Sequence, residues 1–349
     1  MPRETTHGPE ASARTRTGPP ALSPVPTQNT PRPATWPAAG SAPRAPRRLP
    51  RHNVVAIALF LAPASLLFVL LVVTPILLAM YTSLFKWNGF GIPADFIGLG
   101  NYTRLLDDTV FVGDLKRGAI LIVLSLVFQL PMALGLAMLL NQPLRGRAVY
   151  RVLFFAPYVL SEVITAVLFK LVFSPNQGLA NKVTSWLGLG DLGASWLADP
   201  SWVLYSLFIV ITWKYFGFHM ILYLAGRQSI PNEIIEAAEV DGASVWKTFR
   251  YVTLPLLGPT IRISVFLSVI GAIQLFDMVW VLTGGGPVNA SETMAVTMFQ
   301  FGFRRFEVGY ASAISVAMFL ISLVFALLYQ RYVLRRDTEG AVTTMGARR

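Results

Sequence analysis

The sequence predicts an all-α, polytopic membrane protein with six transmembrane helices, a cytoplasmic loop of two short helices and a disordered N-terminal tail. Of its 349 residues, 54% are hydrophobic and only 13% are charged, and the mean hydropathy is +0.55. Soluble domains carry roughly a quarter charged residues, so a soluble fold of this composition would lack polar surface to cover its core. The other two observations are six apolar segments of membrane-spanning length and the gathering of Lys and Arg beside their ends.

The N-terminal segment 1–52 is unlike the rest of the chain. It holds 12 of the 24 prolines, eight of the 29 Lys and Arg residues and almost no large aliphatic side chains. Such a segment cannot bury enough apolar surface to fold, so we expect a disordered cytoplasmic tail. A signal peptide would place its apolar run within about the first thirty residues. Here the first run begins at Val54, so we expect it to be retained as an anchor.

Six apolar segments have the length of about 20 residues that a hydrocarbon layer of about 30 Å requires of a helix. They are 54–82, 118–140, 150–174, 202–225, 260–283 and 309–333. Prolines inside them are tolerated because neighbouring groups in a membrane protein satisfy the freed backbone. We expect one six-helix domain over 53–335 and a cytoplasmic tail over 336–349.

The positions of Lys and Arg near the ends of these segments indicate the orientation. They are dense in the N-terminal tail, in the 141–151 turn, in the 226–262 loop and at the C-terminus, and sparser on the other side. We therefore expect both termini and the 226–262 loop to face the cytoplasm, with membrane lipid around the helices. This topology explains the net charge of +11, so no nucleic-acid partner is expected.

Within the segment 231–259 the sequence predicts two short helices joined by a fixed elbow. A proline suits the first turn, and three glutamates lie where a helix N-terminus favours negative charge. Gly242 ends the first helix, because Gly readily adopts the left-handed conformation. A second helix over about 243–252 is then stopped by Pro255 and Pro259.

This pair of helices has two interpretations. Amphipathic helices that lie on lipid are usually rich in Lys and Arg on the polar face, whereas 231–241 is acidic. The acidic character favours a protein partner over a lipid surface.

The same segment carries a family motif. Glu236-Ala237-Ala238-x-x-Asp241-Gly242-Ala243, followed by Phe249 and Leu254-Pro255, resembles the EAA loop of binding-protein-dependent ABC importer permeases. In that family the loop docks in a cleft of the cytoplasmic ATPase and transmits its closure to the membrane helices. The resemblance implies an ATPase-coupling role for Glu236, Ala237, Ala238, Asp241, Gly242, Ala243, Phe249 and Pro255.

Two further stretches resemble the carbohydrate branch of that family. They are Phe96-Ile97-Gly98-Leu99-Gly100-Asn101-Tyr102 and Val281-Leu282-Thr283-Gly284-Gly285-Gly286-Pro287. The chain thus resembles the MalF-like subunit of maltose-type or glycerol-3-phosphate-type importers. The resemblance implies three partners: a second homologous permease subunit, a cytoplasmic ATPase dimer and an extracytoplasmic sugar-binding protein.

No nucleotide or metal site is expected on this chain. The glycines at 284–286 are not followed by the Lys-Ser/Thr of a phosphate-binding loop, and no Walker motif occurs elsewhere. The chain has no cysteine, and its three histidines are scattered, unlike a metal cluster. We expect a transport subunit without cofactors rather than an enzyme, with ATP and Mg²⁺ bound by a separate ATPase.

A sugar path requires hydrogen-bonding and aromatic side chains on helix faces that point into the bundle. The fourth and fifth segments supply candidates at helical spacing: Thr212, Tyr215 and Phe218, and then Ser268, Gly271, Gln274 and Asp277. Simple packing is the alternative for the aromatic residues.

Ionisable residues inside a membrane segment are costly and indicate function. We expect Lys214 to pair with Glu162 or Asp277, or else to snorkel or line water. The same three residues could form the ion site of a secondary carrier, the main alternative function, although the two repeated halves common in such carriers are not evident. An intramembrane enzyme would require a nucleophile and a base, for which the segments offer little beyond His219.

Overall fold

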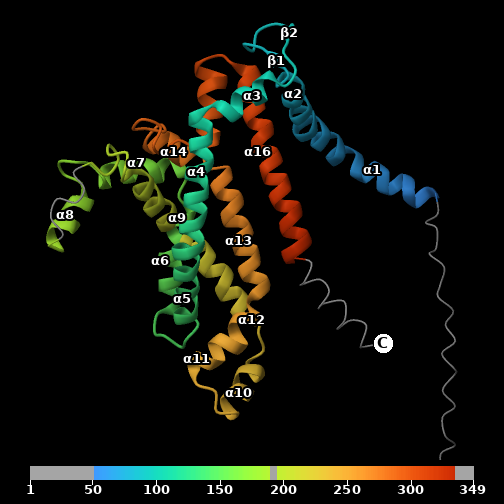
Figure 1. The fold of residues 1–349 in the computed structure, drawn as a ribbon. Coiled ribbons are helices and arrows are strands. Elements are labelled where there is room, and N and C mark those ends of the chain that lie inside the picture. The colour runs from blue at the N-terminus through green and yellow to red at the C-terminus, as the bar shows by residue number, and fades with distance from the viewer. Residues whose placement is uncertain (1–50, 189–194, 335–349) are drawn as a thin grey trace, which may run out of the picture. The chain divides into compact units, whose positions relative to one another are not determined.

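The structure is a computed structural model that describes residues 51–188 and 195–334, almost entirely as helices (Figure 1). The predicted tail over 1–52 lies outside these residues except for Arg51 and His52, which begin the first helix. The predicted tail over 336–349 lies outside them entirely. The described residues from Leu61 onward, 61–188 and 195–334, belong to one compact unit.

In chain order, the elements are mostly helices. The helices are α1 (Arg51–Phe68), α2 (Thr74–Thr82), α3 (Gly100–Asp107), α4 (Thr109–Leu124), α5 (Leu130–Leu140), α6 (Arg147–Val159), α7 (Glu162–Val172), α8 (Leu179–Trp186), α9 (Val203–Gln228), α10 (Asn232–Val240), α11 (Val245–Thr248), α12 (Leu254–Leu256), α13 (Gly258–Ile273), α14 (Asp277–Leu282), α15 (Met294–Phe299) and α16 (Val308–Tyr329). Strands β1 (Phe85–Lys86) and β2 (Asp95–Phe96) pair antiparallel, with Phe85 opposite Phe96. The described part of the chain also has five π-helical turns, which cover Val69–Val73, Ser125–Gln129, Phe249–Thr253, Gln300–Arg304 and Gln330–Leu334.

Three of the π-helical turns end two residues before a proline. These prolines are Pro75, Pro131 and Pro255. A proline has no N–H, and its ring crowds the carbonyl four residues earlier. Widening the preceding turn lets the helix pass the proline without a break. The prediction that Pro255 stops the second loop helix is therefore wrong, because the backbone remains helical to Leu256. Pro259 likewise lies in the first turn of α13 and does not end a helix.

Among residues 51–188 and 195–334, four helices are long and apolar enough to cross a membrane, and the number rises to six if each of two bent helix pairs is one span. The four are Leu59–Thr82, Thr109–Leu140, Val203–Gln228 and Val308–Leu334. They correspond to the predicted first, second, fourth and sixth segments. The second begins earlier than predicted because the Asp108 carboxylate caps it, accepting a hydrogen bond from the Val110 N–H at 2.9 Å.

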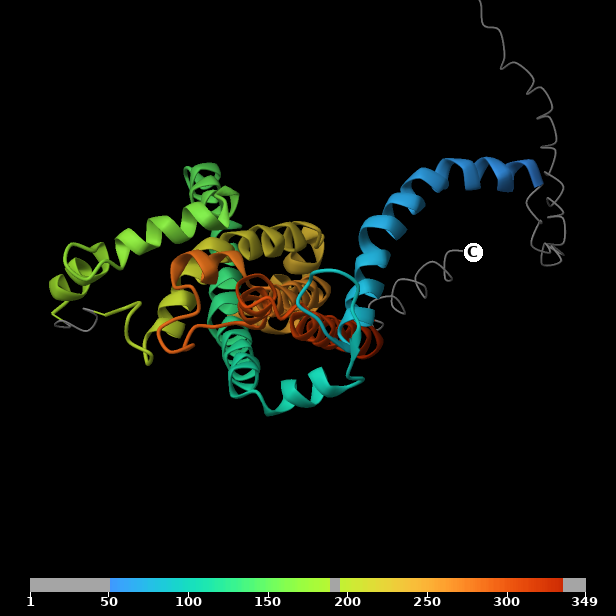
Figure 2. The same ribbon diagram turned by 90° about the horizontal axis from the view of Figure 1, so that it is seen from above.

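The predicted third span over 150–174 is wrong as a single straight helix. It consists of α6 and α7, which are bent by 100° relative to each other. Leu160 between them is extended, and the Ser161 hydroxyl restarts the helix by accepting the Ile164 N–H at 3.2 Å. Seen from above, α7 lies across the direction of the long helices (Figure 2).

The predicted fifth span over 260–283 is also interrupted. Helix α13 ends at Ile273, and α14 begins at Asp277 after a short break. Helix α14 packs against α7. The two interrupted segments therefore meet, which brings their breaks close to the centre of the bundle.

Close packing holds the central helices together. α9 packs against both α5 and α6, and Ala133 and Ala137 of α5 are fully buried in a cluster with Met220 of α9. At Gly217 an added Cβ would lie 1.9 Å from the Phe154 carbonyl oxygen, so only glycine permits this approach of α6 and α9. Small residues at helix contacts are typical of membrane proteins, where packing replaces the hydrophobic effect.

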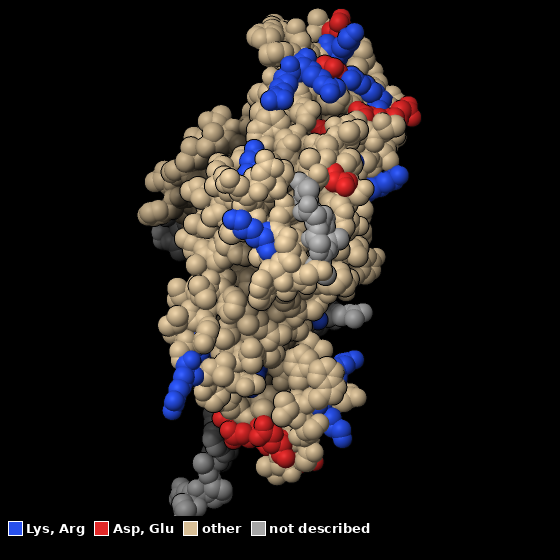
Figure 3. Space-filling view, turned by 90° about the vertical axis from the view of Figure 1, so that its left-hand side faces the viewer, with Lys and Arg blue, Asp and Glu red and all other residues tan. Residues whose placement is uncertain are grey.

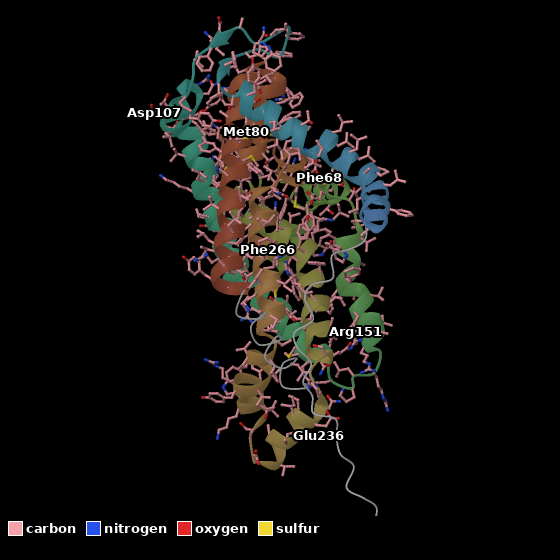
Figure 4. All side chains as sticks on the ribbon, turned by 90° about the vertical axis from the view of Figure 1, so that its right-hand side faces the viewer. Phe68, Met80, Asp107, Arg151, Glu236 and Phe266 are labelled. Carbon is pink, nitrogen blue, oxygen red and sulfur yellow. The ribbon has the colours of Figure 1, made fainter. Side chains whose placement is uncertain are left out.

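The two ends of the bundle carry different structures (Figure 1). The strands and α3 lie at one end, and α10 and α11 lie at the other. Most charged side chains on the face in Figure 3 also gather at the two ends, with few between them. Figure 4 labels Asp107 at the first end and Glu236 at the second. We call these the strand end (residues 85–117 and 283–310) and the loop end (residues 231–257).

Candidate translocation cavity and coupling loop

A cavity of about 360 Å³ lies inside the bundle, between the strand end and the loop end. Its walls come from α4 and the π-helical turn after it, from α6, α7, α9 and α13, and from the break before α14. Six of the seven predicted pathway residues line it: Tyr215, Phe218, Ser268, Gly271, Gln274 and Asp277.

Thr212 does not line the cavity. A three-residue spacing advances only about 300° around an α-helix, so Thr212 is turned away from the face that carries Tyr215 and Phe218. Ile211 takes that place instead, one helical turn before Tyr215. The Thr212 hydroxyl oxygen is buried and has no hydrogen-bond partner within the described part of the chain.

The helix break at 274–276 brings the polar residues of the fifth segment to the cavity. Because α13 stops at Ile273, Gln274 lies at its end with an exposed side chain, and Asp277 opens α14. Glu162 opens α7 in the same way. Each of these half-helices thus starts with a carboxylate at the cavity, where the positive end of the helix dipole stabilises it.

Lys214 does not form an ion pair in the described residues. It is buried, with 3% of its surface exposed, so it does not snorkel. Its Nζ donates to the Leu160 carbonyl oxygen and, at 3.5 Å, to that of Tyr158. The predicted direct pairing with Glu162 or Asp277 is therefore wrong. The lysine instead donates hydrogen bonds to backbone carbonyls that have no partner within a helix, because the break between α6 and α7 interrupts the helical hydrogen bonds.

The Glu162 carboxylate is held by a hydrogen bond from the Tyr215 hydroxyl. Tyr158 adds an aromatic wall, since its ring stacks on that of Phe218 with the centroids 4.8 Å apart. The cavity therefore combines flat aromatic faces with carboxylate and hydroxyl groups.

Among the cavity residues that sequence reasoning missed are Ser125, Gln129 and Tyr158. Ser125 and Gln129 are four residues apart, so the two polar side chains share one face of an apolar helix. That spacing was the signal that could have identified them. Nothing comparable marked Tyr158, which reaches the cavity only because α6 ends just after it.

The loop end has the predicted elbow. Pro231 precedes α10, and Asp241 follows it with Gly242 at φ +80°. The Ser244 hydroxyl then caps α11 by accepting the Lys247 N–H at 3.5 Å. The left-handed conformation predicted for Gly242 is confirmed.

The motif residues of the loop gather around this elbow, on or near its surface. Glu236, Ala237, Asp241, Gly242 and Pro255 are exposed, and Ala238, Ala243 and Phe249 are half-buried. Large apolar side chains flank them, including Val240 at 88%, Val245 at 85% and Trp246 at 69% exposure. Because water does not favour such a surface, the loop end presents an unpartnered apolar patch next to acidic residues.

A family of known proteins accounts for this arrangement. The family model for the binding-protein-dependent transport system inner membrane component matches residues 109–337, which include the cavity and the elbow. The chain belongs to this family. It is therefore a multi-pass membrane permease subunit, and nothing in the comparisons supports an ion-coupled carrier.

Similar proteins cover most of the permease. The chain is 36% identical over 284 residues to the lactose transport system permease protein LacF of Rhizobium radiobacter, covering 80% of this chain and 94% of the relative. It is 31% identical over 271 residues to the trehalose/maltose transport system permease protein MalF of Thermococcus litoralis, covering 78% and 91%. A crystal structure of a bacterial ABC transporter involved in the import of the acidic polysaccharide alginate matches with a TM-score of 0.70 and 25% identity, over 82% of this chain and 96% of that chain.

Membership of this family makes the chain a transport subunit, as expected. Among residues 51–188 and 195–334, no group of three or more His, Cys, Asp or Glu side chains is placed to hold a metal ion.

Proposed function

We propose that this chain is the membrane subunit of an ATP-driven carbohydrate importer, and that its cavity is half of the translocation path. The observation that carries the proposal is the cavity itself, which combines the Tyr158–Phe218 stack with the polar groups of Gln274 and Asp277. Flat aromatic faces suit the apolar faces of sugar rings, and carboxylates and amides bind their hydroxyls. The lactose and trehalose/maltose permeases among its relatives support the same class of substrate.

A second homologous permease subunit would supply the other half of the path. An extracytoplasmic sugar-binding protein would deliver the substrate at the strand end, and both termini would lie in the cytoplasm. The dense Lys and Arg residues of the 141–151 turn and the 226–262 loop support this orientation. Reporters inserted after Gly146 and after Gly284 should label from opposite sides of the membrane, and labelling from the same side would contradict it.

ATP and Mg²⁺ would bind to a cytoplasmic ATPase dimer, into which the elbow at Gly242 would dock. The route from the elbow to the cavity is continuous in the backbone. The helical path from α11 through α12 bends by 66° into α13, and α13 carries Ser268 and Gly271 into the cavity wall. A displacement of the elbow by the ATPase would therefore move the wall that contacts the sugar.

Transport by reconstituted vesicles tests this function. Uptake of sugar delivered by the binding protein should require ATP and should stop when the ATPase is left out, which a secondary carrier would not show. Gln274→Ala and Tyr215→Ala should weaken uptake or change the sugar preference while the complex still assembles. Asp199→Asn is the matched control, because that carboxylate caps its own loop and lies outside the cavity lining. Unchanged uptake kinetics in both cavity variants would remove these residues from the path.

A further inference from the structure

The cavity has an unbalanced charge. Its lining contains two carboxylates, Glu162 and Asp277, and neither lysine nor arginine in the described residues. Lys214 precedes the lining residue Tyr215 but does not line the cavity, and its ammonium donates to backbone carbonyls. One lysine beside two carboxylates leaves the cavity negative.

The two carboxylates differ in how they are held. Glu162 accepts the Tyr215 hydroxyl and is the carboxylate nearer to Lys214. Asp277 is exposed to the cavity, and within the described part of the chain it has neither a hydrogen bond nor an ion pair. Its oxygens are therefore free to accept hydrogen bonds from a bound molecule.

A second group in the cavity also lacks a partner. Gln129 is 2% exposed, and its Oε1 accepts a hydrogen bond from the Ser125 hydroxyl. Its Nε2 has no partner among the described residues, although it is buried. A buried amide donor without a partner destabilises the folded state, so its retention at a cavity wall points to a ligand that accepts its hydrogen bond. The π-helical turn that ends at Gln129 fits this reading, since such turns are frequent at functional sites.

We infer that the cavity selects its substrate by charge: it takes uncharged and amino-bearing saccharides and excludes saccharides that carry a carboxylate or a sulfonate. Asp277 sets this selection, and Gln129 donates a hydrogen bond to an oxygen of the sugar. The inference rests on the proposed function of the cavity as a sugar path. It adds a charge selectivity to that function. It also adds a hydrogen-bond donor, Gln129, to the pathway residues already predicted on α9 and α13.

The physical basis is the weak screening inside the bundle. At an effective dielectric constant of about 20, two unit charges within the same cavity change each other's binding by roughly tenfold or more. A substrate anion is thus repelled by Asp277, and a substrate cation is attracted by it. Because sugar hydroxyls are uncharged donors, a neutral sugar binds the free carboxylate without this penalty.

The charge of the cavity can be measured with a thiol probe. The chain has no cysteine, and a Cβ added at Gly271 meets no atom within 4 Å, so Gly271→Cys places one thiol in the cavity wall. The assembled complex is treated with methanethiosulfonate reagents that carry either a trimethylammonium or a sulfonate group. Each rate is divided by that of the same reagent with a small free thiol.

We expect the cationic reagent to react faster than the anionic one. Adding Asp277→Asn should lower this rate ratio roughly tenfold or more, because it slows the cation and speeds the anion. Asp95→Asn is the matched control, because Asp95 is an exposed carboxylate of β2 outside the cavity lining, and it should leave the ratio unchanged. A ratio that Asp277→Asn does not alter overturns the charge selection.

A protection experiment on the same thiol separates this inference from the proposed function. Glucose and glucosamine should slow the reaction of Gly271→Cys with an uncharged reagent, and glucuronate should not until Asp277→Asn is added. Gln129→Leu should reduce protection by glucose without changing the rate ratio of the charged reagents. Equal protection by glucuronate and glucose in the parent overturns the charge selection and leaves the sugar path standing. Protection by none of the three sugars overturns the sugar path itself.

Discussion

The strand end and the loop end of this permease are held together in opposite ways. At the strand end, side chains bridge segments that are far apart in the sequence. The Thr297 hydroxyl donates to Asp114 at 2.6 Å, the Arg117 Nε donates to the Glu292 carbonyl at 2.9 Å, and Tyr310 donates to Asp108 at 2.7 Å. The loop end instead holds its elbow with local bonds.

The exposed surfaces of the two ends complete the contrast. Around the elbow, Val240, Val245 and Trp246 are mostly exposed beside acidic residues. An apolar surface of this kind, with few bonds to the rest of the chain, indicates a docking site for another protein. The strand end is thus closed by this chain's own hydrogen bonds, whereas we expect the loop end to be completed by the ATPase.

The largest expected effect is at the loop end, where Gly242→Val should abolish sugar-stimulated ATP hydrolysis in the assembled complex. A β-branched residue at positive φ is strongly disfavoured, at a cost of about 1 kcal/mol or more. The elbow would relax that strain by changing its angle. No atom lies within 4 Å of an added Cβ, so the effect would come from the backbone conformation rather than from a clash.

Gly242→Asn is the matched control, because Asn tolerates the left-handed conformation. It should retain most of the ATP hydrolysis at equal membrane levels. If valine and asparagine variants behave alike, the fixed elbow is not what transmits the closure.

A smaller effect is expected at the strand end, on stability rather than on coupling. Asp114→Ala removes the buried acceptor of Thr297 and Arg117 and should lower the unfolding free energy by about 1–3 kcal/mol. The measurement is thermal unfolding of the purified complex. Glu307→Gln is the comparison, because the Glu307 pair with Arg104 is half-exposed and should contribute less than about 1 kcal/mol. Equal losses in the two variants would contradict the view that buried bridges close this end.

The smallest expected effect is the pH dependence of stability that arises from Glu292. This residue lies in the loop between α14 and α15. Burial, with the neighbouring Asp114 carboxylate as a further cause, raises the pKa of Glu292 above its ordinary value of 4.5. Folding therefore favours the protonated carboxyl. Its stabilising contribution is complete below pH 4.5 and is lost as the pH rises through the raised pKa. Relative to Glu292→Gln, the parent should lose stability over that interval, and a constant difference would contradict the raised pKa.

The sequence predicted what depends on local or periodic patterns. Apolar length identified the straight helices such as α9 and α16, and the glycine rule identified the elbow at Gly242. The breaks before Glu162 and Asp277 were not predicted, because an apolar run reads alike in one straight helix and in two half-helices that meet. The same breaks explain the wrong pairing of Lys214, whose partners are backbone carbonyls that exist only where a helix is interrupted.

The prolines teach a related lesson. Pro255 was expected to end a helix, yet the π-helical turn over Phe249–Thr253 carries the helix past it. Such a turn depends on backbone hydrogen bonding over a whole helical turn, which residue type alone does not reveal.

The comparison of the two ends can be tested with two single cysteines of matched exposure. Val240 at the loop end is 88% exposed, and Ile92 at the strand end is 89% exposed. Each is replaced by cysteine, and the rate of alkylation is measured for the permease pair with and without its ATPase, in the absence of the binding protein. The account predicts that the ATPase protects Val240→Cys and leaves Ile92→Cys as reactive as before. Equal reactivity of Val240→Cys in both preparations would contradict the central claim that the exposed elbow is the surface on which the ATPase docks.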